Sequence, residues 1–265
     1  VMLSGASVAV GAISASSTGF DGPQILLNAI DDVTVGTVTS VYAEVYAGAS
    51  YLVTAGGDYL QTGPVTLLPL PAVFIGPSYA VNAGGTAIVL GAISTGDASP
   101  APGGSIQIVA AGDVQWHGSA QADGGDGGRI FVRSTGGDVV LSGAKSTLAT
   151  AAAGAFSLGS IFFDAARDLV QSGIVSGGSF VPGPRSNLTD AGGVTLRAGR
   201  EMRVASGGTI GSTAFGVGTV AHDVTLSGCR VVVEPGASVL VCNSPSIVPD
   251  TEGSVRIEVG DHVVG

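Results

Sequence analysis

An acidic residue recurs along this chain at the head of a short apolar segment. The heptapeptide GDVQWHG at 112–118 returns as GDYLQTG, GDVVLSG, RDLVQSG and HDVTLSG, and REMRVAS carries Glu in the acid position. The acids that share this repeat position are Asp58, Asp113, Asp138, Asp168, Glu201 and Asp223. In stacked repeats they would form a column of carboxylates, which could collect calcium. Because Asp at a tight turn accepts hydrogen bonds from backbone amides, we expect a turn-capping role instead.

A second candidate calcium site is the stretch ADGGDGGRI at 122–130. It resembles the glycine-aspartate turns of calcium-binding nonapeptide repeats, which makes Asp123 and Asp126 candidate ligands. The stretch occurs once, and Arg129 stands where those repeats need an aspartate, so the indication is weak. No Cys or His is spaced as a metal-binding pair, and the sequence indicates no other cofactor and no catalytic residue.

The two cysteines, Cys229 and Cys242, flank the apolar run RVVVEPGASVLV. If EPGA is a turn between neighbouring strands, a disulfide would join those strands, as in proteins of oxidising compartments. Two free thiols are the alternative, and the sequence favours neither.

Charge is distributed unevenly along the 265 residues, whose net charge is −10. Residues 1–128 contain nine acidic residues and no Lys or Arg, whereas all nine Arg and the single Lys145 follow. A chain with no basic residue in half its length is a poor nucleic-acid partner, because that affinity depends on Lys and Arg contacts. Prolines interrupt the longest apolar stretch, PVTLLPLPAVFIGP at 64–77, so no membrane span is predicted.

The repeats predict an all-β fold. Units such as GGSIQIVAAGDVQWHGSAQADG at 103–124 combine two segments of alternating apolar and polar residues, which is typical of strands with one buried face. Such units bury that face only by stacking, so we predict a right-handed parallel β-helix, or β-solenoid, with irregular loop insertions. We expect residues 103–265 to form its regular part and residues 1–102 a less regular N-terminal part. The echo of GASVAVGAIS in GTAIVLGAIS indicates that the two parts are continuous.

The pattern GGxIxIxAxGDVxxxG followed by GGxGGxIxVxxxGG, carried by residues 103–143, resembles the β-helices of exported bacterial surface proteins. The resemblance is to filamentous-haemagglutinin-like adhesins and autotransporter passenger domains, with weaker echoes in 5–95 and 159–265. It implies an extracellular or cell-surface rod without catalysis, acting as an adhesin or as part of a filament, sheath or stalk. The implied partners are other copies, further repeats of the same chain, or surface glycans.

Two other functions remain open for such a fold. A polysaccharide lyase or hydrolase would need clustered carboxylates, whereas these acids are spread one per repeat. A flat-face binder such as an ice-binding protein would need a regular threonine ladder, and TVGTVTS at 34–40 is an isolated cluster.

Overall fold

The computed structural model describes ten segments of the chain: residues 1–17, 22–42, 48–67, 76–96, 103–124, 127–149, 159–180, 193–215, 221–243 and 253–260. These segments contain strands, turns and bends, and none of them contains a helix. Within these ten segments, therefore, there is no helix long and apolar enough to cross a membrane.

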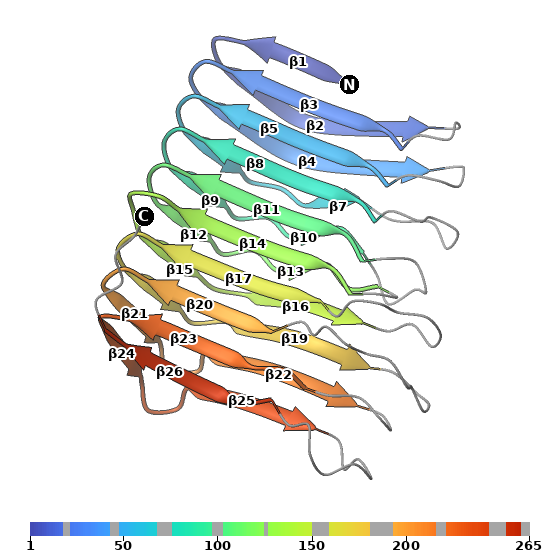
Figure 1. The fold of residues 1–265 in the computed structure, drawn as a ribbon. Helices are drawn as coiled ribbons and strands as arrows, with labels where there is room; N and C mark the ends of the chain where they lie inside the picture. Colours follow the sequence, from blue (N-terminus) through green and yellow to red (C-terminus); the bar gives the residue numbers. More distant parts are fainter. Residues whose placement is uncertain are drawn as a thin grey trace.

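One sheet contains ten parallel strands stacked in chain order (Figure 1). They are β1 (Met2–Gly5), β3 (Gln24–Ala29), β5 (Ser50–Ala55), β8 (Ser78–Ala83), β11 (Ser105–Ala110), β14 (Arg129–Ser134), β17 (Ser160–Ala165), β20 (Val194–Ala198), β23 (Val224–Gly228) and β26 (Val255–Val259). We call this sheet the long-strand sheet.

The second sheet has two arms joined through the long strands β2 (Val8–Ser17) and β4 (Val33–Tyr42). The first arm continues with β6 (Tyr59–Gln61), β9 (Ala87–Val89), β12 (Val114–Trp116), β15 (Val139–Leu141), β18 (Leu169–Gln171), β21 (Glu201–Val204) and β24 (Arg230–Val233). The second arm continues with β7 (Val65–Leu67), β10 (Ile93–Ser94), β13 (Ala120–Gln121), β16 (Ala144–Ala149), β19 (Ile174–Phe180), β22 (Thr209–Phe215) and β25 (Ser238–Asn243).

Each coil of the chain therefore adds one strand to the long-strand sheet and one to each arm. Figure 1 shows the near strands running right to left and the far strands left to right as the chain descends, which is a right-handed coil. Coil length ranges from 24 residues, between the paired Met2 and Leu26, to 35, between Ile174 and Thr209. This is the predicted parallel β-solenoid, and the same sheets run through residues 1–102 and 103–265.

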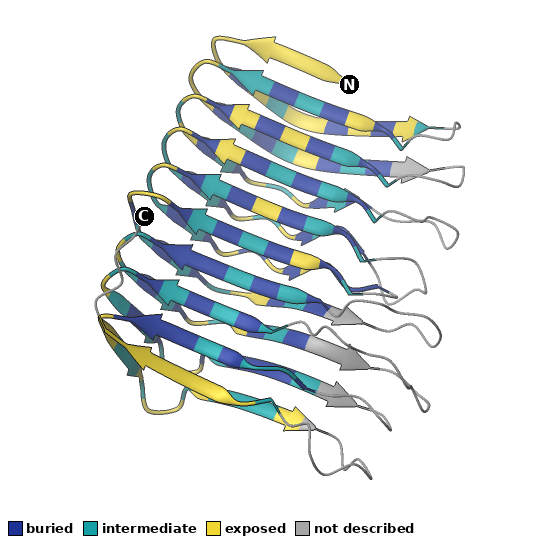
Figure 2. Cartoon of the chain, viewed as in Figure 1, coloured by how far each residue is buried: buried dark blue, intermediate teal, exposed yellow. Residues whose placement is uncertain are grey.

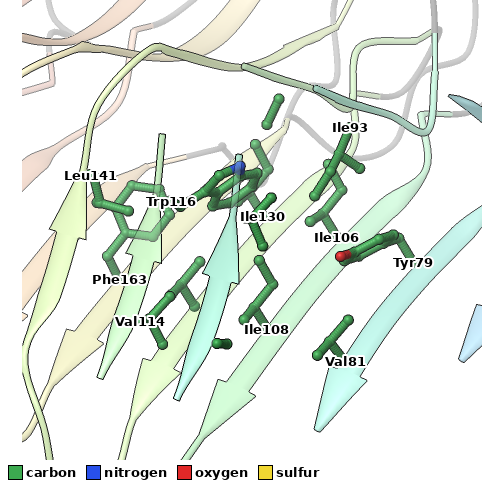
Figure 3. Close-up of a cluster of buried hydrophobic side chains, with 14 of the residues drawn as sticks. Tyr79, Val81, Ile93, Ile106, Ile108, Val114, Trp116, Ile130, Leu141 and Phe163 are labelled. Atoms are coloured by element: carbon green, nitrogen blue, oxygen red, sulfur yellow. The ribbon is translucent and has the colours of Figure 1, made fainter. Parts of the chain in front are cut away.

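Alternation along the strands separates a buried face from an outer one (Figure 2). In β11, Ile106, Ile108 and Ala110 are buried, and they stack on the buried residues of β8 and β14. The residues drawn in Figure 3 meet in the middle of this core, around the fully buried Trp116. The alternation in the sequence therefore corresponds to one buried and one outer face, as predicted for the repeat at 103–124.

Glycines close the coils where the second arm meets the next long strand. A Cβ on Gly159 would overlap the carbonyl oxygen of Thr147, and a Cβ on Gly104 would overlap that of Thr95. At these corners the glycine before the long strand removes a side chain for which there is no room, whereas β23 follows His222 and Asp223. This close approach is the physical origin of the GGxI pattern.

Candidate functional site

The recurring acids connect successive coils at the turn between the long-strand sheet and the first arm. Strand register adds Asp32 to the sequence-predicted set and places Thr86 at the same position one coil after Asp58. We define the acid column as Asp32, Asp58, Asp113, Asp138, Asp168 and Glu201.

One carboxylate oxygen of each aspartate in the acid column accepts a hydrogen bond from a backbone amide one coil further on. The N···O distances are 2.8 Å from Asp58 to Asp32, 2.7 Å from Thr86 to Asp58, 2.9 Å from Asp138 to Asp113, 3.1 Å from Asp168 to Asp138 and 3.1 Å from Glu201 to Asp168. These amides would otherwise point out of the turn without a protein partner, so the acids cap the turns.

A glycine in front of Asp58, Thr86 and Asp138 leaves room for the carboxylate of the preceding coil, whereas Arg167 and Arg200 hold the same place before Asp168 and Glu201. A Cβ on Gly137 would overlap Oδ1 of Asp113, and a Cβ on Gly85 would overlap Oδ1 of Asp58. A GD pair therefore has two roles in one coil. Its glycine leaves space for the carboxylate of the preceding coil, and its aspartate accepts a hydrogen bond from a backbone amide of the next coil. Coil stacking therefore favours the repeated dipeptide without requiring its glycine in every coil.

Arginines cover the C-terminal half of the acid column. Arg167 lies 3.0 Å from Asp113 and 3.1 Å from Asp138, measured between nitrogen and carboxylate oxygen. Arg200 lies 2.7 Å from Asp168, and Arg230 lies 3.0 Å from Glu201 on the same edge. Their side chains are 46–69% exposed, so each pair contributes on the order of 0–1 kcal/mol.

A surface hollow lies beside these ion pairs. It is lined by Asp168, Arg200, Glu201, Arg203, Cys229 and Arg230. Both carboxylates are already paired, Asp168 with Arg200 and Glu201 with two arginines. The hollow therefore holds two carboxylates paired among three arginines, and neither of these carboxylates is held apart for acid or base catalysis.

Asp223 does not belong to the acid column, although HDVTLSG resembles the other copies. It precedes β23 of the long-strand sheet, and the register pairs β23 with β20 and β26. Asp223 nevertheless makes the same kind of contact, accepting from the Ser254 amide at 2.7 Å and the Ser254 hydroxyl at 2.9 Å. These hydrogen bonds hold the pKa of Asp223 below its usual value.

The candidate calcium ligands are only partly described. Asp123 is 8% exposed, and its Oδ2 accepts hydrogen bonds from Gln121 at 3.0 Å and Ser146 at 3.2 Å. Asp126 lies outside the described residues. Among the residues that are described, no group of three or more His, Cys, Asp or Glu is arranged to hold a metal ion.

Both cysteines are exposed free thiols. The thiol of Cys229 donates to the carbonyl of Gly199 at 2.9 Å. The strands on either side of EPGA do not form a hairpin, because β24 pairs with β21 and β25 pairs with β22. Cys229 thus lies at the turn before β24 of the first arm and Cys242 within β25 of the second arm, and the geometry expected for a disulfide between neighbouring strands is missing.

Polar groups inside the core form a second set of features that sequence patterns do not reveal. The hydroxyls of Tyr51, Tyr59 and Tyr79 lie in a chain, at 3.2 Å and 3.0 Å, and Tyr79 donates to Gln61 Oε1 at 2.7 Å. Burial raises the pKa values of all three tyrosines well above normal. Gln171 is equally buried, yet neither polar atom of its amide has a hydrogen-bond partner.

A column of small polar side chains lines the outer face of the second arm. We define the hydroxyl column as the seven aligned residues Ser14, Thr39, Thr66, Ser94, Gln121, Ser146 and Ser176. No member carries a charge, and parallel pairing spaces the members about 4.8 Å apart. The varying coil length hides this alignment, because equivalent residues do not recur at one interval in the sequence.

No family model, curated protein or solved structure matches this chain.

Proposed function

We propose that this chain is a structural or adhesive β-solenoid of the cell surface or extracellular space, forming part of a filament, sheath or stalk. The observation that carries the proposal is the state of the two ends of the coil. Val255 and Ile257 of β26 continue core positions of β23, yet they are 41% and 54% exposed. At the other end, Leu3 of β1 continues the core position of Leu27, yet it is 37% exposed.

Open ends favour association because an edge strand carries unpaired backbone donors and acceptors. Figure 2 shows β1 and β26 exposed along their whole length, in contrast to the strands between them. Coils of another copy, or further repeats of the same chain, would pair with these strands and bury the apolar residues.

The lateral faces support a structural role rather than catalysis. Five aspartates of the acid column each accept a hydrogen bond from a backbone amide of the next coil through one carboxylate oxygen. These carboxylates are distributed along the rod, whereas glycoside cleavage needs two that flank one bond. The resemblance of the repeats to exported surface proteins supports the extracellular location.

Sedimentation velocity over a range of protein concentrations tests the proposal. We expect the wild type to form larger species as concentration rises and Ile257→Glu at the end of the rod to reduce them. Leu90→Glu is the matched control, because Leu90 is 48% exposed on the side of the rod. Association that is lost equally in both variants, or is absent from the wild type, would overturn the proposed axial contact.

The hydroxyl column supports glycan binding as a second candidate function. An uncharged row of hydroxyl and amide groups suits an extended neutral polysaccharide, whose hydroxyls recur along its length. Co-sedimentation with insoluble cellulose and chitin tests this function, with Thr66→Glu as the variant on the column. Equal retention of wild type and variant would reject this face as the binding surface.

A further inference from the structure

Lys145, the only lysine of the chain, occupies an inward position that is aliphatic in the adjacent coils. Its register partner in β13 is Ala120, and its partner in β19 is Val175. Lys145 is 1% exposed. A primary amine is therefore buried where stacking calls for an apolar side chain.

The amine is held by carbonyl oxygens and an indole face. Nζ donates to the carbonyls of Gly118 at 2.8 Å and Trp116 at 3.4 Å, and also to that of Ser142. It lies 4.8 Å from the centroid of the Trp116 ring. We call these groups the amine cage, and they sit at the corner between the two arms of the second sheet.

Lys145 takes part in none of the ion pairs found among the described residues. Strand β19 has no titratable group. The titratable groups of the other strands packed around Lys145 lie at turns or on outer faces. These groups are Asp113 and His117 beside β12, Asp123 after β13, Asp138 before β15, Arg129 and Arg133 on β14, and Asp164 on β17. His117 is directly connected to the cage, because its Nδ1 lies 2.9 Å from Ser142 Oγ.

We propose that Lys145 is a proton-sensitive latch, which closes this corner at alkaline pH and lets the coils around it open more readily in acid. A neutral amine can donate to two of the three carbonyls, whereas a protonated one can donate to all three but adds a charge without a counter-ion to the core. Burial lowers the pKa of Lys145 to about 7. Because each coil contacts mainly its neighbours, the cost of that charge falls on the adjoining coils rather than on the whole rod.

The sign and size of the effect follow from linkage between protonation and opening. In the opened corner the amine is in water and regains a pKa of about 10.4, so opening takes up a proton. With a pKa of about 7 in the closed corner, the opening constant rises about tenfold from pH 8 to pH 6. Below pH 6 both states are protonated, and the effect levels off.

Two measurements on the intact chain test the latch. The first is an NMR titration of protein labelled with carbon-13 at the lysine Cε, which gives one signal because Lys145 is the only lysine. We expect a midpoint near pH 7, and a midpoint near 10 would overturn the proposal by placing the amine in water. This titration needs no variant.

The second measurement is amide hydrogen exchange of the segment 139–149 from pH 6 to pH 8, corrected for the intrinsic exchange rate. We expect the tenfold change in the wild type and in His117→Asn, and its loss in Lys145→Met. The segment 24–29, several coils away, is the internal control. Persistence of the change in Lys145→Met, or its loss in His117→Asn, would assign the sensitivity to another group and overturn the proposal.

Discussion

Replacing Asp138 separates its hydrogen-bond role from its charge. The carboxylate accepts from the Asp168 amide at 3.1 Å and lies 3.1 Å from the Arg167 guanidinium. Asp138→Ala removes both contacts, whereas Asp138→Asn retains an oxygen that can accept from the amide. A lost cap of this kind costs about 1 kcal/mol, and an exposed ion pair contributes about 0–1 kcal/mol.

We therefore expect Asp138→Ala to lower the free energy of unfolding by about 1–2 kcal/mol and Asp138→Asn by less than about 1 kcal/mol. Urea denaturation followed by circular dichroism gives both values, provided that the slopes agree among variants. Asp58→Asn serves as a control, because Asp58 takes part in none of the ion pairs found among the described residues. It should behave like the wild type.

The same experiment distinguishes capping from calcium binding. If the acid column holds calcium, EDTA will destabilise the wild type, and both Asp138 variants will lose that dependence. If the acids are caps, EDTA will leave the denaturation midpoint unchanged. Equal destabilisation by Asp138→Asn and Asp138→Ala would refute the capping argument, because only the alanine variant lacks an acceptor.

Three further substitutions test the packing. Gln171→Leu should raise the free energy of unfolding by about 1–3 kcal/mol in urea denaturation, because it removes two buried polar atoms without partners. Gln61 lies in the same column of the core. Gln61→Leu should lower the free energy of unfolding by about 1–3 kcal/mol, because the tyrosine hydroxyls lose their hydrogen-bond acceptor. A variant more stable than the wild type would contradict this network. Gly159→Ala should lower the melting temperature by forcing a Cβ against a carbonyl oxygen, whereas Gly11→Ala, with open space around it, should not; equal melting temperatures would reject the steric argument.

Sequence periodicity was enough to predict the solenoid because each coil repeats the same constraints. Alternation identifies the inward residues of β11 and β14, and the GD pair marks the turn that follows them. Both signals are local, since they depend on strand geometry and on contact between adjacent coils. Five of the six acids in the column were predictable for the same reason, whereas Asp32 required the strand register.

Similarity between segments failed where two strands of one coil have similar sequences. HDVTLSG matches GDVVLSG, yet Asp223 introduces a long strand, because only register decides to which sheet a segment belongs. The hydroxyl column was missed because coil lengths vary between its members. The amine cage could not be predicted from the sequence, because two of its acceptors are the backbone carbonyls of Gly118 and Ser142, which do not depend on the type of side chain.

Electron microscopy of the native material tests the central claim, that this solenoid is a structural element continued through its open ends. We predict rods of uniform width whose lengths extend well beyond a single chain as the protein concentration rises. Separate rods of single-chain length at every concentration, together with slow exchange of the amides of β1 and β26, would contradict it.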